Sequence, residues 1–155
     1  MTPTFPPLSL PDNLYPEYPK SWLGEIFFSL LPVAAKARKA HRILHDQLAY
    51  RYKNNINLGE HWSDAENLAI VNIISKETDE LADVKGPWLP DDPFYLFVLL
   101  VDSVDRMQAV QIFMGIEWDY GCVISEEAHD TLRDRGKTVG DFVEVIKSSK
   151  KPKVV

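Results

Sequence analysis

The spacing of apolar residues predicts helices along most of the chain after residue 20. An apolar stripe that starts at Trp22 indicates a first helix, which Ser21 caps and Pro32 breaks or kinks. A second helix is expected from Val33 to about Lys53, and its inward side holds Ala40, Ile43, Leu44, Leu48 and Tyr52. Six prolines within residues 1–19 predict an extended arm before these helices, and its leucines and tyrosines can cover a neighbouring surface: Leu8, Leu10, Leu14, Tyr15 and Tyr18.

Four more helices are expected between residues 61 and 148. Ser63-Asp64-Ala65-Glu66 has the pattern of a capping box and predicts the start of the first one. A long loop follows from Asp83 to Pro93, ahead of an apolar run over Phe94–Val101. Three later helix starts are expected: after Ser103, at Ser125, and at Thr138 with Asp141 three residues later. The sequence thus predicts an all-α protein, with a core of Leu68, Val71, Ile74, Val110, Phe113, Val143 and Ile146.

Charge is distributed unevenly along the chain. Residues 1–60 hold seven Lys or Arg against five Asp or Glu, whereas residues 61–147 hold seven against eighteen. An acidic segment of this kind lacks the basic footprint that nucleic-acid binding requires, so no nucleic-acid partner is expected. The basic helix at 33–53 can lie on a membrane or bind a partner. We expect the other alternative, in which it packs on its own domain and keeps a solvated basic face.

The chemically reactive residue types do not assemble into a catalytic pattern. His41 and His45 lie one helical turn apart, but no third ligand is evident nearby, so no metal site is expected. The single Cys122 excludes an intrachain disulfide and fits a reducing compartment. The chain shows neither a signal-peptide pattern nor an apolar run of the ~20 residues that a membrane span needs. These features predict a cytoplasmic protein that is not an enzyme.

Three pieces of the sequence together resemble the acyl carrier protein family. They are Asp102-Ser103-Val104-Asp105-Arg106-Met107, Ile124-Ser125-Glu126-Glu127, and Lys137-Thr138-Val139-Gly140-Asp141-Phe142-Val143. The resemblance implies an acyl-carrier-like four-helix bundle over residues 61–148, with a phosphopantetheine arm attached to Ser103 and Asp102 beside it. A helix N-terminus at this point would stabilise the phosphodiester through its unpaired N–H groups.

Two departures from the family pattern leave a second alignment open. Leu100 stands where the family has a glycine, and the interval from Ser103 to Ile124 is three residues longer than usual. Shifting the alignment removes this insertion and places Arg106 at the position of the modified serine. That register describes a carrier-like fold without a prosthetic group, with family core positions at Val110, Phe113, Ile116, Tyr120 and Ile124. We expect the Ser103 register, because one extra turn is tolerable in a loop or at a helix end.

The resemblance implies an acyl carrier that bears thioesters in fatty-acid, lipid or polyketide-type synthesis. Its partners would be a phosphopantetheinyl transferase and acyl-processing enzymes with basic docking surfaces, recognised through Asp105, Glu117, Glu126 and Glu127. The alternative is a protein-interaction module that kept the fold and lost the arm. The expected organisation is a proline-rich arm and helical extension at 1–60, the carrier-like domain at 61–148, and a frayed basic tail at 149–155. We expect the extension to pack on the apolar run at 94–101.

Overall fold

The computed structural model describes residues 5–14, 33–101, 106–132, 134 and 136–151. After a short 3-10 helix, η1 (Asp12–Leu14), the chain forms seven α-helices in the described ranges. They are α2 (Val33–Lys53), α3 (Leu58–His61), α4 (Ala65–Ala82), α5 (Phe94–Val101), α6 (Arg106–Tyr120), α7 (Glu126–Leu132) and α8 (Val139–Ser148). No strand occurs in these ranges, where β-type pairing is limited to two isolated bridges, Pro93 with Thr138 and Cys122 with Lys150. The prediction of an all-α protein is confirmed for this part of the chain.

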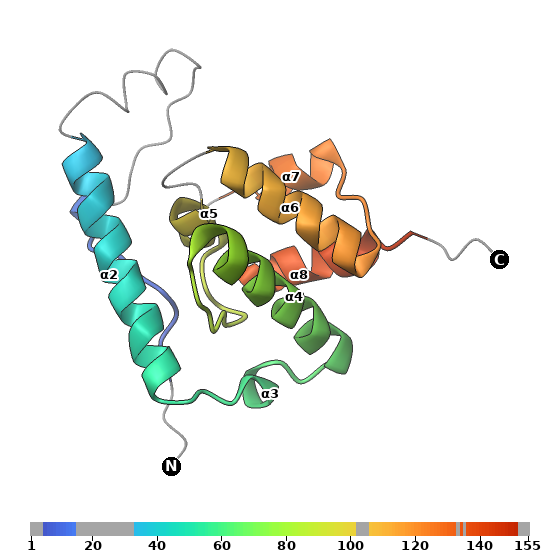
Figure 1. The fold of residues 1–155 in the computed structure, drawn as a ribbon, viewed down its shortest axis with the longest axis horizontal. Helices are drawn as coiled ribbons and strands as arrows, with labels where there is room; N and C mark the ends of the chain where they lie inside the picture. Colours follow the sequence, from blue (N-terminus) through green and yellow to red (C-terminus); the bar gives the residue numbers. More distant parts are fainter. Residues whose placement is uncertain (1–4, 15–32, 102–105, 133, 135, 152–155) are drawn as a thin grey trace.

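Helix α4 lies at the centre of the fold, packed on α6 and α8 (Figure 1). Helix α8 also packs on α5 and α7, so helices α4 to α8 share a common core. Phe142 of α8 is fully buried there, and its ring contacts Phe94, Phe97 and Phe113 from α5 and α6. Burial of these large aromatic surfaces is the main stabilising contribution available to the bundle.

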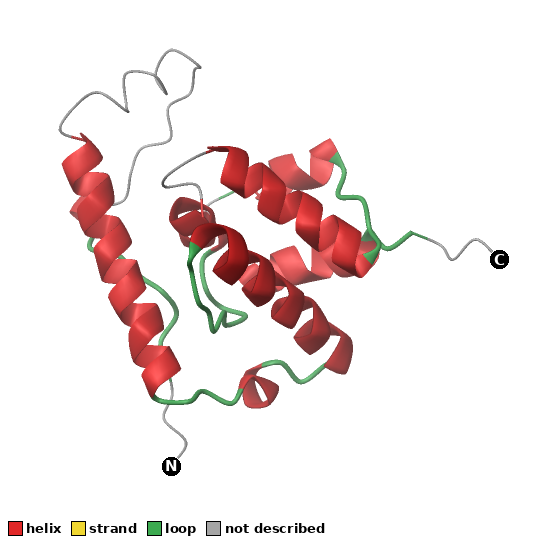
Figure 2. Ribbon diagram, in the orientation of Figure 1, coloured by secondary structure: helices red, strands yellow, loops and turns green. Residues whose placement is uncertain are grey.

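The proline-rich arm and α2 extend the same core rather than forming a separate one. Helix α2 packs on α5 and η1, and the arm runs beside it as loop (Figure 2). Six apolar side chains in the described part of the extension are buried: Leu8, Leu10, Leu14, Ala40, Leu44 and Leu48. The extension thus packs on the rest of the domain as expected, and it is α2 that contacts the apolar run at 94–101. The expected helix and apolar stripe from Trp22 to Leu31, with Tyr15 and Tyr18 of the arm, lie outside the described residues.

Of the helix starts predicted at Ser63, Ser125 and Thr138, two agree with the structure, and the start expected after Ser103 lies outside the described residues. Thr138 forms a capping box with Asp141, and its hydroxyl accepts a hydrogen bond from the Asp141 backbone N–H at 3.2 Å. Ser125 Oγ accepts from the Ala128 backbone N–H at the start of α7. The prediction was wrong at α4, where Asp64 rather than Ser63 is the N-cap and accepts from the N–H groups of Glu66 and Asn67. A carboxylate is a strong acceptor at the positive end of a helix.

Two predicted core positions were wrong because the helices turn different faces inward. Val110 of α6 is 53% exposed and Tyr52 of α2 is 63% exposed. Ile112 and Ile116 fill the core in place of Val110, while Phe113 and Leu68 are only partly buried. The tail prediction also fails over its first residues, since the Lys151 backbone N–H donates to the Gly121 carbonyl at 3.1 Å.

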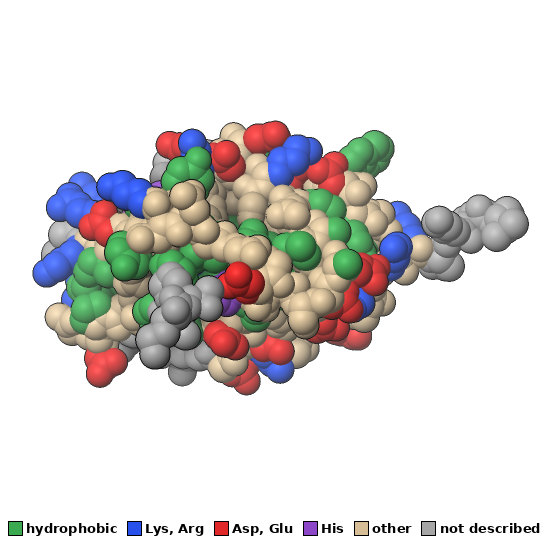
Figure 3. All heavy atoms as spheres, turned by 90° about the horizontal axis from the view of Figure 1, so that it is seen from below, with side chains coloured by type: hydrophobic (Ala, Val, Ile, Leu, Met, Phe, Trp, Pro, Cys, Tyr) green, Lys and Arg blue, Asp and Glu red, His purple; other side chains and the backbone are tan. Residues whose placement is uncertain are grey.

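The two ends of the molecule differ in charge. Figure 3 shows Lys and Arg side chains gathered at the end that carries α2, whereas most Asp and Glu side chains lie toward the rest of the molecule. This arrangement follows the sequence, because the acidic excess belongs to residues 61–147. Within the described residues, no helix is both long and apolar enough to cross a bilayer.

Candidate functional site

Helix α6 presents a continuous apolar ridge to solvent. Val110, Met114 and Trp118 are 53%, 61% and 87% exposed, and their spacing of four residues places them along one face of the helix. Gln111, on the adjoining position, is exposed and uncharged. Exposed apolar surface of this kind is a feature of protein interaction sites, and Trp in particular is enriched among interface residues that carry binding energy.

The core fixes the rotation of α6, so the ridge cannot turn inward. Ile112 and Ile116 on the opposite face are fully buried. Gly115 lies directly against the Glu77 carboxylate of α4, which would have to move to make room for a larger side chain. At the end of the helix, the Tyr120 hydroxyl donates to Glu66 Oε1 at 2.6 Å. Burial and this hydrogen bond raise the pKa of Tyr120 to about 12, which keeps the phenol protonated and able to donate.

Helix α7 contacts α6 and carries two exposed carboxylates, which we call the acidic border. The Phe113 ring of α6 meets His129 of α7 edge-on, with centroids 5.3 Å apart, and this contact joins the two helices. Glu126 and Glu127 lie in the first turn of α7, and both are exposed. Carboxylates in that turn interact favourably with the helix dipole and still offer their charge to a partner.

Four other residues were expected to take part in attachment or partner recognition, and the structure describes only one of them, Glu117. Asp102, Ser103 and Asp105 lie outside the described residues, between Val101 at the end of α5 and Arg106 at the start of α6. Glu117 is half-buried, and its Oε1 accepts a hydrogen bond from the Ile124 backbone N–H at 2.7 Å. The Glu117 carboxylate therefore already holds the turn between α6 and α7.

A buried ion pair is the main feature that the sequence interpretation missed. Arg51 and Asp92 are both buried, with Nη1 to Oδ2 and Nη2 to Oδ1 distances of 2.7 Å. Sequence interpretation treated Arg51 only as part of the basic helix at 33–53 and Asp92 only as part of the loop at 83–93. Asp92 does lie in that loop, where it accepts from the Leu89 backbone N–H, but the burial and pairing of the two residues were not expected. One signal was present, because Arg51 follows Leu44 and Leu48 on the buried face of α2 at helical spacing.

A second polar cluster joins α4 to α6. Burial raises the pKa of the Glu77 carboxyl, and the neighbouring Asp119 carboxylate adds to this effect. Lys76 Nζ lies 3.0 Å from Asp119 Oδ2 and lowers the pKa of that second carboxyl. A protonated Glu77 can donate to Asp119, which makes the cluster a proton-dependent contact between the two helices.

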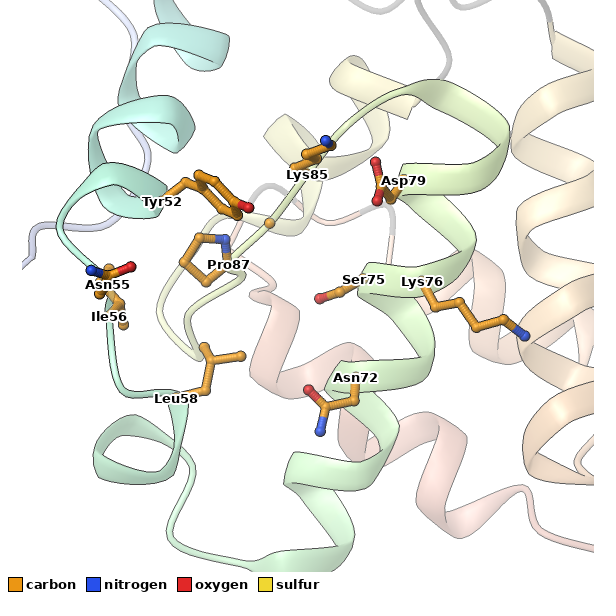
Figure 4. Close-up of a pocket in the computed structure, with 11 residues that line it drawn as sticks. Tyr52, Asn55, Ile56, Leu58, Asn72, Ser75, Lys76, Asp79, Lys85 and Pro87 are labelled. Carbon is orange, nitrogen blue, oxygen red and sulfur yellow. The ribbon is translucent and has the colours of Figure 1, made fainter.

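A polar groove of about 420 Å³ lies between α2, α3, α4 and the loop at 85–87 (Figure 4). Tyr52, Asp79 and Lys85 stand at its border, and Ser75 points from α4 toward Pro87. Ser75 Oγ is buried and has no hydrogen-bond partner in the described structure. The groove could hold a small polar molecule, but the buried hydroxyl is covered and does not reach its open space.

The remaining reactive side chains do not form a chemical centre in the described part of the chain. His41 and His45 have ring centroids 4.4 Å apart, and His41 Nε2 lies 3.2 Å from the Leu100 carbonyl oxygen. Burial lowers the pKa of His41 and raises the pKa of the Cys122 thiol, so both groups favour their neutral forms. Among the described residues, no three His, Cys, Asp or Glu side chains are placed to hold a metal ion.

No family model, curated protein or solved structure matches this chain. The resemblance to acyl carrier proteins therefore rests on the residues of the sequence itself.

Proposed function

We propose that this chain is an acyl carrier protein that bears acyl groups as thioesters on a phosphopantetheine arm attached to Ser103. The observation that supports the proposal is the fifteen-residue helix α6, which the structure describes from Arg106, three residues after this serine in the chain. A helix N-terminus close to the attachment site would favour a phosphodiester through its unpaired N–H groups. Asp102 is proposed to lie beside the attachment point.

The arrangement of the described helices also supports an acyl-carrier-like bundle. A long first helix, α4, packs on α6 and α8, while α7 is short and its first turn holds Glu126 and Glu127. These are the helix types and the order that the resemblance implies. Helix α5 is an addition to that pattern, and its buried side is covered by the N-terminal extension.

The proposed partners are a phosphopantetheinyl transferase and acyl-processing enzymes with basic docking surfaces. The ridge of Val110, Met114 and Trp118 would supply apolar contact, and Glu126 with Glu127 would steer a basic partner toward it. This division predicts that loss of the ridge speeds dissociation, whereas loss of the acidic border slows association. Asp105 is proposed to contribute to the same acidic border.

The deciding experiment is an intact-mass measurement after co-expression with a broad-specificity phosphopantetheinyl transferase. The wild type should gain the mass of one phosphopantetheine, Ser103→Ala should gain none, and the exposed control Ser63→Ala should behave as the wild type. A wild type that remains unmodified beside a carrier that the same transferase loads would refute the proposal.

A second experiment tests whether the ridge of Val110, Met114 and Trp118 contributes to recognition by the transferase. Trp118→Ala should raise the KM of the transferase for this protein and leave Tm unchanged, because the side chain is 87% exposed. Tyr52→Ala is the matched control, since it removes another exposed aromatic ring at the far side of the fold. Equal KM values for both variants would exclude the ridge from recognition of this enzyme.

The alternative function is a carrier-like interaction module without the arm. It is supported by the burial of Ile116 and Ile124, two core positions of the shifted alignment, which places Arg106 at the position of the modified serine. An arginine cannot carry the arm, whereas the ridge on α6 would serve an interaction module equally well. The intact-mass measurement separates the two functions.

A further inference from the structure

Four cations form a patch on the N-terminal half of α2. This basic patch consists of Lys36, Arg38, Lys39 and Arg42, and all four residues are exposed. None of them forms an ion pair in the described part of the chain, where the salt bridges involve Arg51, Lys76, Lys147 and Lys150. The carboxylate of Asp46 lies one turn after Arg42 on the same helix but forms no ion pair with the patch in that part.

The packing of α2 keeps the basic patch directed away from the core. Ala40, Leu44 and Leu48 bury one face of the helix, and Arg38, Lys39 and Arg42 project from the other, while Lys36 is exposed one turn before Ala40. The Arg51–Asp92 pair fixes the C-terminal end of α2. The Lys and Arg side chains consequently gather at one end of the molecule (Figure 3). The acidic residues of 61–147 belong mainly to the other part of the fold, so this end alone can approach a negative surface closely.

We propose that the basic patch binds the surface of an anionic lipid bilayer and holds the protein there peripherally. Clustered Lys and Arg are attracted to anionic headgroups, and the attraction adds about a fivefold gain in affinity per cation near the surface. The neighbouring sequence favours lipid over an acidic protein. Residues 22–31, which lie outside the described residues, hold Trp22, Leu23, Ile26, Phe27, Leu30 and Leu31 just before the patch. Bulky apolar residues beside a basic cluster are the composition of interfacial membrane segments.

This inference does not depend on the arm at Ser103, because the patch lies on α2, whereas Ser103 belongs to the segment between Val101 of α5 and Arg106 of α6. It also gives a reason for the asymmetry of charge. The acidic excess of residues 61–147 would be repelled by the same bilayer, so the molecule would bind in one orientation, with α2 toward the lipid and the acidic surface toward solution.

The test is co-sedimentation of the full chain with vesicles of phosphatidylglycerol and phosphatidylcholine, compared with vesicles of phosphatidylcholine alone. The patch variant is Lys36→Gln/Arg38→Gln/Lys39→Gln/Arg42→Gln. The control variant, Lys53→Gln/Lys85→Gln/Lys137→Gln/Lys151→Gln, removes the same amount of positive charge from other positions without breaking a described ion pair. Thermal melts of both variants establish that the fold is retained.

We expect the wild type and the control to sediment with the anionic vesicles at low salt and to be released as ionic strength rises. The patch variant should bind at least about a hundredfold more weakly. The proposal is overturned if the wild type stays in solution, if it binds neutral vesicles equally well, or if both variants lose binding equally. Binding of the wild type to poly-glutamate but not to vesicles would assign the patch to an acidic protein instead.

Discussion

The buried ion pair between Arg51 and Asp92 offers the sharpest test of how the extension is held. Asp92 accepts four hydrogen bonds of 2.7–2.8 Å, two from Arg51 and one each from the backbone N–H groups of Leu8 and Leu89. Arg51 also donates to the carbonyl oxygens of Pro6 and Pro87. One carboxylate therefore connects the N-terminal arm, α2 and the loop that precedes α5.

Asp92→Asn keeps the size of the side chain but removes the charge and one acceptor. The buried Arg51 guanidinium then loses its counter-ion. The new amide N–H groups would face the N–H donors that now bind the Asp92 carboxylate. Breaking a buried pair in this way costs about 3–5 kcal/mol, because a charge is left without compensation. For a protein of this size each kcal/mol corresponds to about 2–4 °C in Tm, so the expected fall is roughly 6–20 °C.

Chemical denaturation followed by far-UV circular dichroism measures the free energy of unfolding. Asp91→Asn, one residue earlier and exposed, is the matched control and should change stability by less than about 0.5 kcal/mol. The double variant Arg51→Met/Asp92→Leu should recover much of the loss, since an apolar pair leaves no unpaired charge. If Asp92→Asn costs less than about 1 kcal/mol, the pair does not hold the extension as the geometry indicates.

Three further predictions concern the helices of the bundle. Ile112→Ala should cost about 2–5 kcal/mol in denaturant unfolding and Val110→Ala almost nothing, since only the first side chain is buried; similar losses would contradict the rotation of α6. Thr138→Ala should lower the free energy of unfolding by about 1 kcal/mol through loss of the capping box, and an unchanged value would show that α8 does not need it. Burial raises the pKa of Glu77 in the folded state, so its contribution to stability is present below the ordinary carboxyl pKa and is lost as pH rises through the raised value. Glu77→Gln should therefore stabilise the protein at neutral pH relative to the wild type and flatten this part of the pH profile, and identical profiles would exclude the effect.

Local signals in the sequence predicted helix positions well. The bounds of α2, Val33–Lys53, agree with the expectation because Pro32 and the turn residues from Asn54 limit a continuous apolar pattern. The cap at Thr138 was predictable because Asp141 lies three residues later and completes a local hydrogen-bond pattern. Both features depend only on residues close together in the chain.

Features that depend on distant residues were not predictable in the same way. Val110 and Ile112 are both apolar, and only the packing of α6 on α4 decides which of them is buried. Arg51 and Asp92 are forty-one positions apart, so nothing local identifies them as partners. For the candidate site, the exposure of Met114 and Trp118 required the structure, while the attachment of an arm to Ser103 remains a prediction because that residue lies outside the described ranges.

The extension and the proposed attachment site are connected through α5. This helix ends at Val101, two residues before Ser103, and α2 packs along it. The His41 side chain of α2 lies with Nε2 3.2 Å from the Leu100 carbonyl oxygen, and burial favours the neutral imidazole, whose Nε2–H tautomer can donate to that carbonyl. The last turn of α5 is therefore held by a residue of the extension. The chain passes from this turn into residues 102–105, which contain the proposed attachment serine, so the extension supports the helix that precedes that segment.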